Sequence, residues 1–503
     1  MENVHTLAAF NMGIDTHQEP VVYMREDCHV CVAEGFNASS RVLVTNGSHM
    51  LIATLNVVER HVLEAGRVGL SKIAVQRLRA SDGDEICIGH APVLHSLSHV
   101  RKKVFGHALS AFEMREVIED ISAHRYSDME IASFLSVCAG GRLDLDEIIS
   151  LTQAMVACGK RLTWPGEARI FDKHCIGGLP GNRTTPLVVS IASAAGLTVP
   201  KTSSRAITSP AGTADTMEVL TTVDLPLDRI QAIVAETGAC LAWGGAVNLS
   251  PADDLLIRIE RALDLDGEGQ LIASVLSKKI AAGSTHVIID IPVGETAKVR
   301  TRQQADRLAS LFTEVGQACD IFVRCVMTDG SKPIGRGIGP AEEAKDLLAV
   351  LKNEPGAPRD LRQRALHLTA NLLDLADNTG LDAAMRKAVE ILDSGQAWQQ
   401  FQRILRAQGG IKALPQAAYQ HRQLAVRSGV LMSIDNRRLS RLAKLAGAPL
   451  DKAAGLRLFV EVGDRISPDQ PLFTLCSEST GERDYALEYY RQNQDIFVIQ
   501  ESV

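Results

Sequence analysis

The chain contains two similar runs, DKHCIGGLPGNRTT (172–185) and KTSSRAITSPAGTAD (201–215), on either side of an apolar segment. Both runs contain glycine and several hydroxyl residues, and both carry cationic side chains. Glycines let backbone N–H groups converge on an anion, and hydroxyls add further donors. Leu187–Ala195 is expected to form a helix, so the first run would bring an anion to a helix N-terminus. The two runs together predict a phosphate-binding site, whereas a single glycine pair would indicate only a turn.

Apolar strand and helix candidates alternate after the first run, which predicts an α/β domain with a mixed or parallel sheet. Strands are expected at Ala239–Trp243, His286–Pro292 and Asp320–Met327, and helices at Asp228–Glu236, Ala273–Ala282, Thr301–Val315 and Pro340–Asn353. Residues 354–410 are also expected to be helical.

Three capping-box patterns precede this domain, at Ser110, Ser127 and Asp144, each with a glutamate three residues later. Apolar residues at three- and four-residue spacing follow each one, which predicts a helical subdomain. The expected domains are a β-rich N-terminal domain (1–88), the helical subdomain (89–165, with part of the following region), the α/β phosphate- and substrate-binding domain (166–412) and an α+β C-terminal domain (413–503).

Short β-type runs define the two terminal domains. The N-terminal ones are Val21–Met24, Val42–Val44, Met50–Val57 and His61–Ala65, followed by Ser71–Leu78 as a helix or a further strand. The C-terminal ones are Val426–Ile434, Arg457–Val462, Pro471–Leu475 and Ile496–Ile499, with a helix at Leu439–Ala446.

Composition describes an ordinary soluble protein. Among 503 residues, 53 basic and 60 acidic side chains give a net charge of −7, which argues against a general nucleic-acid binder. No apolar run is long enough to span a membrane and no secretion signal is visible, so a cytoplasmic location is expected. Cys28 and Cys31 have a spacing that zinc sites use, but no second Cys/His pair at such spacing follows, and no metal is expected.

The two runs, together with PADDLLIRIERALDLDGEGQLIASVLSKKIAAG (251–283) and SGVLMSIDNRRLSRLAKLAGAPLDKAAG (428–455), resemble the thymidine phosphorylase and AMP phosphorylase family. The resemblance covers roughly four-fifths of the chain, and motifs of this length are poorly explained by chance. It implies an enzyme that transfers a pentose from a nucleoside or nucleotide to phosphate. It also implies a nucleoside-phosphorylase-type fold, no cofactor beyond phosphate as co-substrate, and a homodimer or larger homo-oligomer, without nucleic-acid or membrane partners. The N-terminal domain resembles the AMP phosphorylase branch.

By resemblance, the phosphate-binding residues are Lys173, Thr185, Ser203 and Thr213. Cys175 stands where the family usually has serine, and a thiol is the weaker donor. The base would meet His174, Ser274 and Lys278. The last two are four residues apart and face the same way on a helix. The remaining implied substrate positions are Gly178, Ser204, Arg205, Ala206, Ile207, Thr208, Ser209 and Lys298.

Asp266 matches the carboxylate that AMP phosphorylases are thought to use as a proton donor, although an aspartate there could equally form a turn or cap a helix. The favoured activity converts thymidine and phosphate to thymine and 2-deoxy-α-D-ribose 1-phosphate. The alternative acts on AMP or another nucleoside 5′-monophosphate and gives ribose 1,5-bisphosphate, with Arg205 and Lys298 as candidate partners of the second phosphate. A phosphoribosyltransferase is disfavoured because no acidic pair for magnesium lies within Lys173–Arg205. A third hypothesis is a nucleotide sensor without catalytic activity. Only Cys175, in place of the serine usual in the family, supports it.

Overall fold

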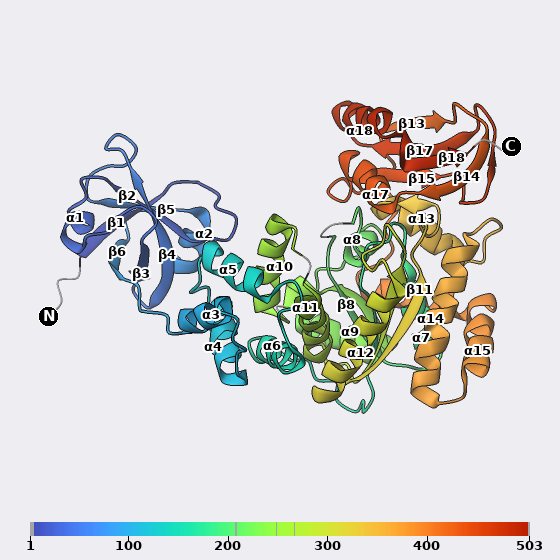
Figure 1. Ribbon diagram of the computed structural model, residues 1–503, viewed down its shortest axis with the longest axis horizontal. Coiled ribbons are helices and arrows are strands. Elements are labelled where there is room, and N and C mark those ends of the chain that lie inside the picture. The colour runs from blue at the N-terminus through green and yellow to red at the C-terminus, as the bar shows by residue number, and fades with distance from the viewer. Residues whose placement is uncertain (1–4, 207–208, 248, 266, 501–503) are drawn as a thin grey trace. The chain divides into compact units, whose positions relative to one another are not determined.

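The computed structural model describes residues 5–206, 209–247, 249–265 and 267–500. Figure 1 follows the chain from its β-rich N-terminal part to its C-terminal strands. The described chain forms two compact units. The first contains the residues up to Cys158 together with Pro251–Gln270, and the second contains Gly159–Ser250 and everything from Leu271 onward. The four domain boundaries expected from the sequence remain predictions.

The first unit begins with a closed barrel whose strands run in the order β1-β5-β2-β4-β3-β6. These are β1 (His5–Asn11), β2 (Val21–Arg25), β3 (Arg41–Asn46), β4 (His49–Val58), β5 (Arg67–Leu70) and β6 (Glu85–His90). Two short helices accompany them, α1 (His29–Glu34) and α2 (Lys72–Leu78). The barrel interior is filled by aliphatic side chains such as Val22, Val42, Leu55 and Val68, all fully buried. Closure leaves no unpaired strand edge, which stabilises a small β-domain.

The rest of the first unit is helical. Its helices are α3 (Ser96–Val104), α4 (Ala111–Ser122), α5 (Asp128–Cys138), α6 (Leu145–Ala157) and α10 (Pro251–Leu263). The capping boxes predicted at Ser110, Ser127 and Asp144 are all formed, and each begins a helix. The structure adds α10, more than ninety residues later in the chain, to this helical part.

The second unit contains a parallel sheet of three strands, in the order β11-β10-β7, and a parallel pair, β8-β9. The strands are β7 (Phe171–Cys175), β8 (Val199–Ser203), β9 (Ala239–Trp243), β10 (His286–Val293) and β11 (Phe322–Asp329). The connecting helices are α7 (Thr184–Ala194), α8 (Thr213–Glu218), α9 (Leu227–Thr237), η1 (Gly244–Val247), α11 (Glu268–Ala281) and α12 (Arg302–Ala318). The predicted α/β fold is confirmed, and of the two sheet types expected, mixed or parallel, the strands of this part form parallel pairs.

A further helical layer packs around α7. It comprises α13 (Pro340–Leu351), α14 (Arg359–Asp377), α15 (Leu381–Asp393) and α16 (Gln396–Ala407). Helices α14 and α16 contact α7, and α15 runs beside α14 (Figure 1). Leu187, Val188 and Ile191 of α7 are fully buried in the resulting core. This layer therefore fixes the helix that follows the first donor-rich run.

The chain ends in a small α+β part with its own core. Its elements are β13 (Tyr419–Leu424), β14 (Gly429–Ile434), α17 (Asn436–Leu445), β15 (Gly455–Leu458), β16 (Arg465–Ile466), β17 (Pro471–Ser477), α18 (Thr480–Gln492), η2 (Gln494–Ile496) and β18 (Phe497–Gln500). A two-residue strand of the α/β part, β12 (Gly337–Ile338), extends its sheet in the order β12-β15-β17-β13. The C-terminal part is thus joined to the α/β part by strand pairing.

Several predicted elements differ from the observed ones. His61–Ala65 forms turns between β4 and β5 and no strand, and four of its five residues are exposed, so only Leu63 reaches the core. The predicted strand Arg457–Val462 ends at Leu458. The predicted helix Leu187–Ala195 begins three residues earlier, so that Thr184 and Thr185 lie in its first turn.

Glu147 should contribute far more to stability than an ordinary capping glutamate. Its buried carboxylate accepts from Lys103 Nζ at 2.6 Å and from the Leu109 amide at 2.8 Å. Glu147→Ala leaves the buried Lys103 charge without a counter-charge, so we expect the free energy of unfolding to fall by about 3–5 kcal/mol in urea denaturation followed by circular dichroism. Glu130→Ala, which removes only a capping box, should lower it by about 1 kcal/mol. Equal losses in the two variants would contradict this assignment.

Candidate functional site

Strand β7 carries three consecutive candidate residues, Asp172, Lys173 and His174, and pairs with β10 along its length. Successive side chains of a strand point to opposite faces of the sheet. Lys173 accordingly lies beside Asp290 of β10, with Nζ 3.5 Å from the carboxylate. Asp172 instead contacts two lysines of neighbouring elements. Lys173 therefore lies on one face of the sheet, toward the loop that follows β7 in the first run (172–185). Asp172 and its two lysines form a separate charge cluster on the other face.

Lys173 is fully buried at the base of the first loop. Its ammonium donates to Thr184 Oγ1 at 2.9 Å, in the first turn of α7. Thr185, also predicted to bind phosphate, is buried in the same turn. Cys175 accepts a weak hydrogen bond from Asn182 Nδ2 at 3.4 Å, and burial raises the pKa of this thiol to about 12. A neutral thiol therefore occupies the position where the family usually has a hydroxyl.

The first loop needs its glycines. Gly178 and Gly181 both have positive φ angles, 83° and 73°. A Cβ on Gly181 would lie 2.1 Å from the carbonyl oxygen of Ile334, and one on Gly178 would lie 2.8 Å from the backbone nitrogen of Lys298. Close backbone approach at these points admits only glycine. The same packing brings the predicted substrate residues Gly178 and Lys298 together.

Arg183 joins the two donor-rich runs. Its guanidinium donates to Thr213 Oγ1 at 2.9 Å and to the carbonyl oxygen of Ala211 at 2.8 Å, both in the second run. Its Nε donates to Glu343, a fully buried carboxylate, at 2.6 Å. Thr213 accepts this bond through its oxygen, so its hydroxyl proton can be donated elsewhere. The sequence interpretation requires the two runs to be neighbours, and the structure places them side by side.

Asp215 shapes the second run. Its Oδ2 accepts from the amides of Ala206 at 2.7 Å and Gly212 at 3.0 Å, so the carboxylate holds both ends of the loop. A Cβ on Gly212 would lie 2.6 Å from the Ala206 nitrogen. Ser204 is exposed, and its carbonyl oxygen accepts from the Ala214 amide at 3.4 Å. Ser209 donates its hydroxyl to the Ala211 carbonyl oxygen at 3.0 Å and thus supports the loop from within.

Ser203 stands out at the end of β8. Its Oγ is buried and has no hydrogen-bond partner among the residues that the structure describes. A buried hydroxyl without a partner is destabilising unless a ligand satisfies it. The next residue, Ser204, bonds to the start of α8, which Thr213 begins. An unsatisfied donor thus lies close to where the two runs meet.

Three lysines surround His174. Asp172 binds Lys279 Nζ at 2.6 Å and Lys201 Nζ at 3.2 Å. Burial lowers the pKa of Lys201 to about 7. Burial, followed by the charges of Lys279, Lys201 and Lys278, lowers the pKa of His174 well below 6.5. His174 is therefore a neutral imidazole at physiological pH.

The base-contacting candidates lie on one face of α11. Lys278 Nζ donates to Ser274 Oγ at 3.1 Å, as their four-residue spacing predicts. The charge of Lys278 also acts on His174, which places these three residues in one neighbourhood. Arg258 of α10, in the sequence run that precedes α11, donates to Asp128 of α5 at 2.6 Å.

Arg205 is held in place by protein carboxylates. It makes a bidentate pair with Glu218 at 2.6 and 2.7 Å, lies 3.4 Å from Asp215, and stacks over the Trp243 ring at 4.8 Å. Such a guanidinium has few donors left for a substrate. Three other candidates, Asp266, Ile207 and Thr208, lie outside the described residues.

Sequence reasoning missed two charged groups of the site. Lys279 was not among the predicted site residues, but its side chain is fully buried and pairs with Asp172. A signal existed, because Lys279 lies seven residues after the buried Ile272 and four after Val275, on the apolar face of α11. Glu343 gave no such signal, since its partner Arg183 is 160 residues earlier in the chain.

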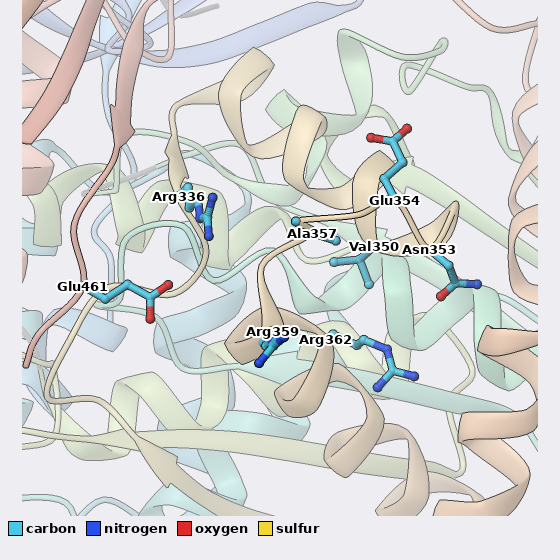
Figure 2. Close-up of a pocket in the computed structure, with 9 residues that line it drawn as sticks. Arg336, Val350, Asn353, Glu354, Ala357, Arg359, Arg362 and Glu461 are labelled. Atoms are coloured by element: carbon cyan, nitrogen blue, oxygen red, sulfur yellow. The ribbon is translucent and has the colours of Figure 1, made fainter. Parts of the chain in front are cut away.

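A separate surface hollow of about 640 Å³ lies near the start of α14 (Figure 2). Arg336, Arg359 and Arg362 line it together with Glu354 and Glu461. Arg362 is already paired with Asp393 at 2.6 Å. None of the predicted site residues lines this hollow, so it is distinct from the loops described above.

The chain matches three family models. These are the glycosyl transferase family helical bundle domain over residues 98–159, the glycosyl transferase family a/b domain over 167–398, and the pyrimidine nucleoside phosphorylase C-terminal domain over 430–497.

Within the described residues, no helix is both long and apolar enough to cross a membrane.

Curated relatives match along nearly the whole chain. "Putative thymidine phosphorylase 2" of Acidovorax sp. is 53% identical over 99% of this chain and 97% of its own length. "Putative thymidine phosphorylase" of Legionella pneumophila (strain Paris) is 50% identical over 99% and 96%. Among solved structures, anthranilate phosphoribosyltransferase from Thermus thermophilus aligns with a TM-score of 0.51 at 20% identity, over 61% of this chain and 98% of that one, which supports the fold alone.

The helical part, the parallel α/β part and the matches to both glycosyl transferase domains define a pentosyltransferase, an enzyme that moves a pentose between a base and an acceptor. With half of its residues identical to these relatives over the full length, the chain belongs to the thymidine phosphorylase family of glycosyl transferases.

The neutral state of His174 should appear in the pH dependence of stability. Because its folded-state pKa lies well below 6.5, the unfolded chain takes up a proton there as pH falls below 6.5 and the folded chain does not. Folding is therefore weakened toward acid, by about 1.4 kcal/mol between pH 7.5 and 5.5. His174→Asn has no imidazole at this position. Between pH 7.5 and 5.5, its free energy of unfolding should therefore fall by about 1.4 kcal/mol less than that of the wild type. The control His61→Asn, at an exposed histidine, should show the same pH dependence of stability as the wild type. The same dependence in His174→Asn would contradict the neutral state assigned to His174.

Proposed function

We propose that this enzyme is a nucleoside phosphorylase that acts on thymidine, releasing thymine and forming 2-deoxy-α-D-ribose 1-phosphate. The observation that carries the proposal is the buried hydroxyl of Ser203, which has no hydrogen-bond partner among the described residues and lies close to where Arg183 joins the two donor-rich runs. A bound phosphate would satisfy this hydroxyl and accept from Thr213 and Lys173. A phosphate oxygen attacks the anomeric carbon while the glycosidic electron pair leaves with the base, so the chemistry requires no metal or organic cofactor.

The rate enhancement would come from positioning and preorganised charge, because phosphate is already a nucleophile. Lys173 and the hydroxyls of the two runs would hold it. On the other side, Lys278 and Ser274 would stabilise the negative charge that develops on the pyrimidine carbonyls. A neutral His174 suits a hydrogen bond to the base and not proton transfer as an imidazolium.

The state of Arg205 favours a nucleoside over a nucleoside 5′-monophosphate. A 5′-phosphate would need its own cation, and Arg205 was one of two candidates. Glu218 and Asp215 already neutralise it, and diverting it to a substrate phosphate would break its ion pairs with both carboxylates. AMP and other nucleotides thus remain the alternative substrates, with Lys298 as the other candidate. The expected homo-oligomer and cytoplasmic location stay predictions.

Ser203→Ala tests the phosphate site without disturbing the fold. Since Ser203 Oγ bonds to no described protein group, its removal should leave the unfolding midpoint unchanged. Loss of one hydrogen bond to a charged ligand corresponds to about 1.5–3 kcal/mol, so we expect the KM for phosphate to rise by about 10- to 100-fold. Ser190→Ala is the matched control, because that hydroxyl donates to the Pro186 carbonyl within α7 at 2.7 Å. An unchanged KM for phosphate in Ser203→Ala would contradict the site.

Substrate choice is tested by incubating the purified enzyme and phosphate with thymidine, uridine, cytidine, adenosine and their 5′-monophosphates, and by quantifying free base. We expect thymidine to have the highest kcat/KM. A higher value for AMP or another nucleotide would replace the proposal by its alternative, and no base release from any of them would refute phosphorolysis altogether.

A further inference from the structure

The C-terminal part of the chain reaches the second donor-rich run through one side chain. Lys452 lies in the turn between α17 and β15, and its Nζ is 2.8 Å from Glu218 and 3.3 Å from Asp215, both in α8. Its side chain is 31% exposed and that of Asp215 only 3%, so the contact is shielded from water on the α8 side. Ion pairs that are partly excluded from solvent are screened less than surface pairs.

Asp215 transmits this contact to the loop. Its Oδ1 faces Lys452 and Arg205, at 3.3 and 3.4 Å. Its Oδ2 accepts the amides of Ala206 and Gly212, at the two ends of the loop. One carboxylate therefore joins the C-terminal part to the backbone that follows Ser203 and precedes Thr213.

The turn that carries Lys452 is itself firmly seated. The Ala341 amide at the start of α13 donates to the Lys452 carbonyl oxygen at 3.1 Å. Next to it, β12 pairs with β15, and the backbones approach so closely that a Cβ on Gly339 would lie 2.5 Å from the Ala454 carbonyl oxygen. The ammonium is thus presented to α8 from a fixed backbone rather than from a loose tail.

We propose that Lys452 is a positioning residue of the phosphate site: through Asp215 and Glu218, its ion pairs fix the backbone at Ala206 and Gly212, between Ser203 and Thr213. Lys452 itself contacts neither reacting group. The part of this inference that concerns phosphate rests on the proposed function, whereas the part that concerns the loop rests on the contacts alone.

The four charged groups Asp215, Glu218, Arg205 and Lys452 form a cluster with no net charge, so both cations are needed to balance the two carboxylates. Asp215 and Glu218 carry two negative charges, and Lys452 and Arg205 balance them. Without Lys452, Arg205 alone would be drawn between the two carboxylates, and Asp215 would be free to shift relative to the Ala206 and Gly212 amides. Small displacements of groups that hold a reactant reduce rates strongly.

Hydrogen exchange followed by mass spectrometry tests the loop directly. The variants are Lys452→Met, which keeps the aliphatic stem but not the charge, Lys452→Arg, and the control Arg438→Met, which breaks the Asp495 pair inside the C-terminal part. We expect peptides with the Ala206 and Gly212 amides to exchange about tenfold faster in Lys452→Met, because Asp215 no longer holds both amides. Lys452→Arg and Arg438→Met should match wild type. Unchanged exchange in Lys452→Met overturns the proposal.

Phosphorolysis kinetics on the same proteins test the consequence for the site. We expect Lys452→Met to raise the KM for phosphate by about tenfold, with a smaller change in the KM for the nucleoside, and Lys452→Arg to restore it. Faster loop exchange with an unchanged KM for phosphate would overturn the positioning role. If the wild-type enzyme shows no phosphorolysis, the proposed function fails while the exchange result still decides whether Lys452 fixes the loop. Equal thermal midpoints for Lys452→Met and Arg438→Met exclude general unfolding as the cause.

Discussion

The arrangement of the site depends on the guanidinium of Arg183. This group comes from the end of the first donor-rich run and donates to both Thr213 and Ala211 of the second. Its charge would be unfavourable in a buried position without a counter-ion, and the buried carboxylate of Glu343 provides one. Since Glu343 belongs to α13, the helical layer of the second unit takes part in setting the distance between two loops that precede it in the chain.

A second charge cluster gives the site its chemistry. Asp172 pairs with both Lys201 and Lys279, while Lys278 on the same helix as Lys279 is a partner of Ser274. Burial and then the surrounding cations lower the pKa of His174 and keep its imidazole neutral, so proton donation to a leaving base would have to come from another group or from water. A pyrimidine anion can leave when its carbonyl oxygens are stabilised, which agrees with a lysine and a serine in this place and with thymidine as the proposed substrate.

Much of the fold could be predicted from the sequence because short-range residue patterns specify where its helices and strands form. The capping boxes at Ser110, Ser127 and Asp144 satisfy helix N-termini with side chains three residues away, so short-range chemistry fixed where each helix begins. The α/β architecture followed from alternating helix and strand patterns, which left open whether the sheet is mixed or parallel. The strand expected at His61–Ala65 did not form, because a short run cannot compete with the turns that close the barrel between β4 and β5.

By itself, the sequence determined the two donor-rich runs, the spacing of Ser274 and Lys278, and membership of a family that transfers pentoses. Each of these is a property of neighbouring residues. Only the tertiary structure decided that Arg183 joins the two runs, that Arg205 is neutralised by Glu218, and that Lys452 reaches Asp215 from 237 residues away. The reason is physical: the partner of a buried charge is chosen by burial and distance after folding, and neither quantity is encoded in the spacing of residues along the chain.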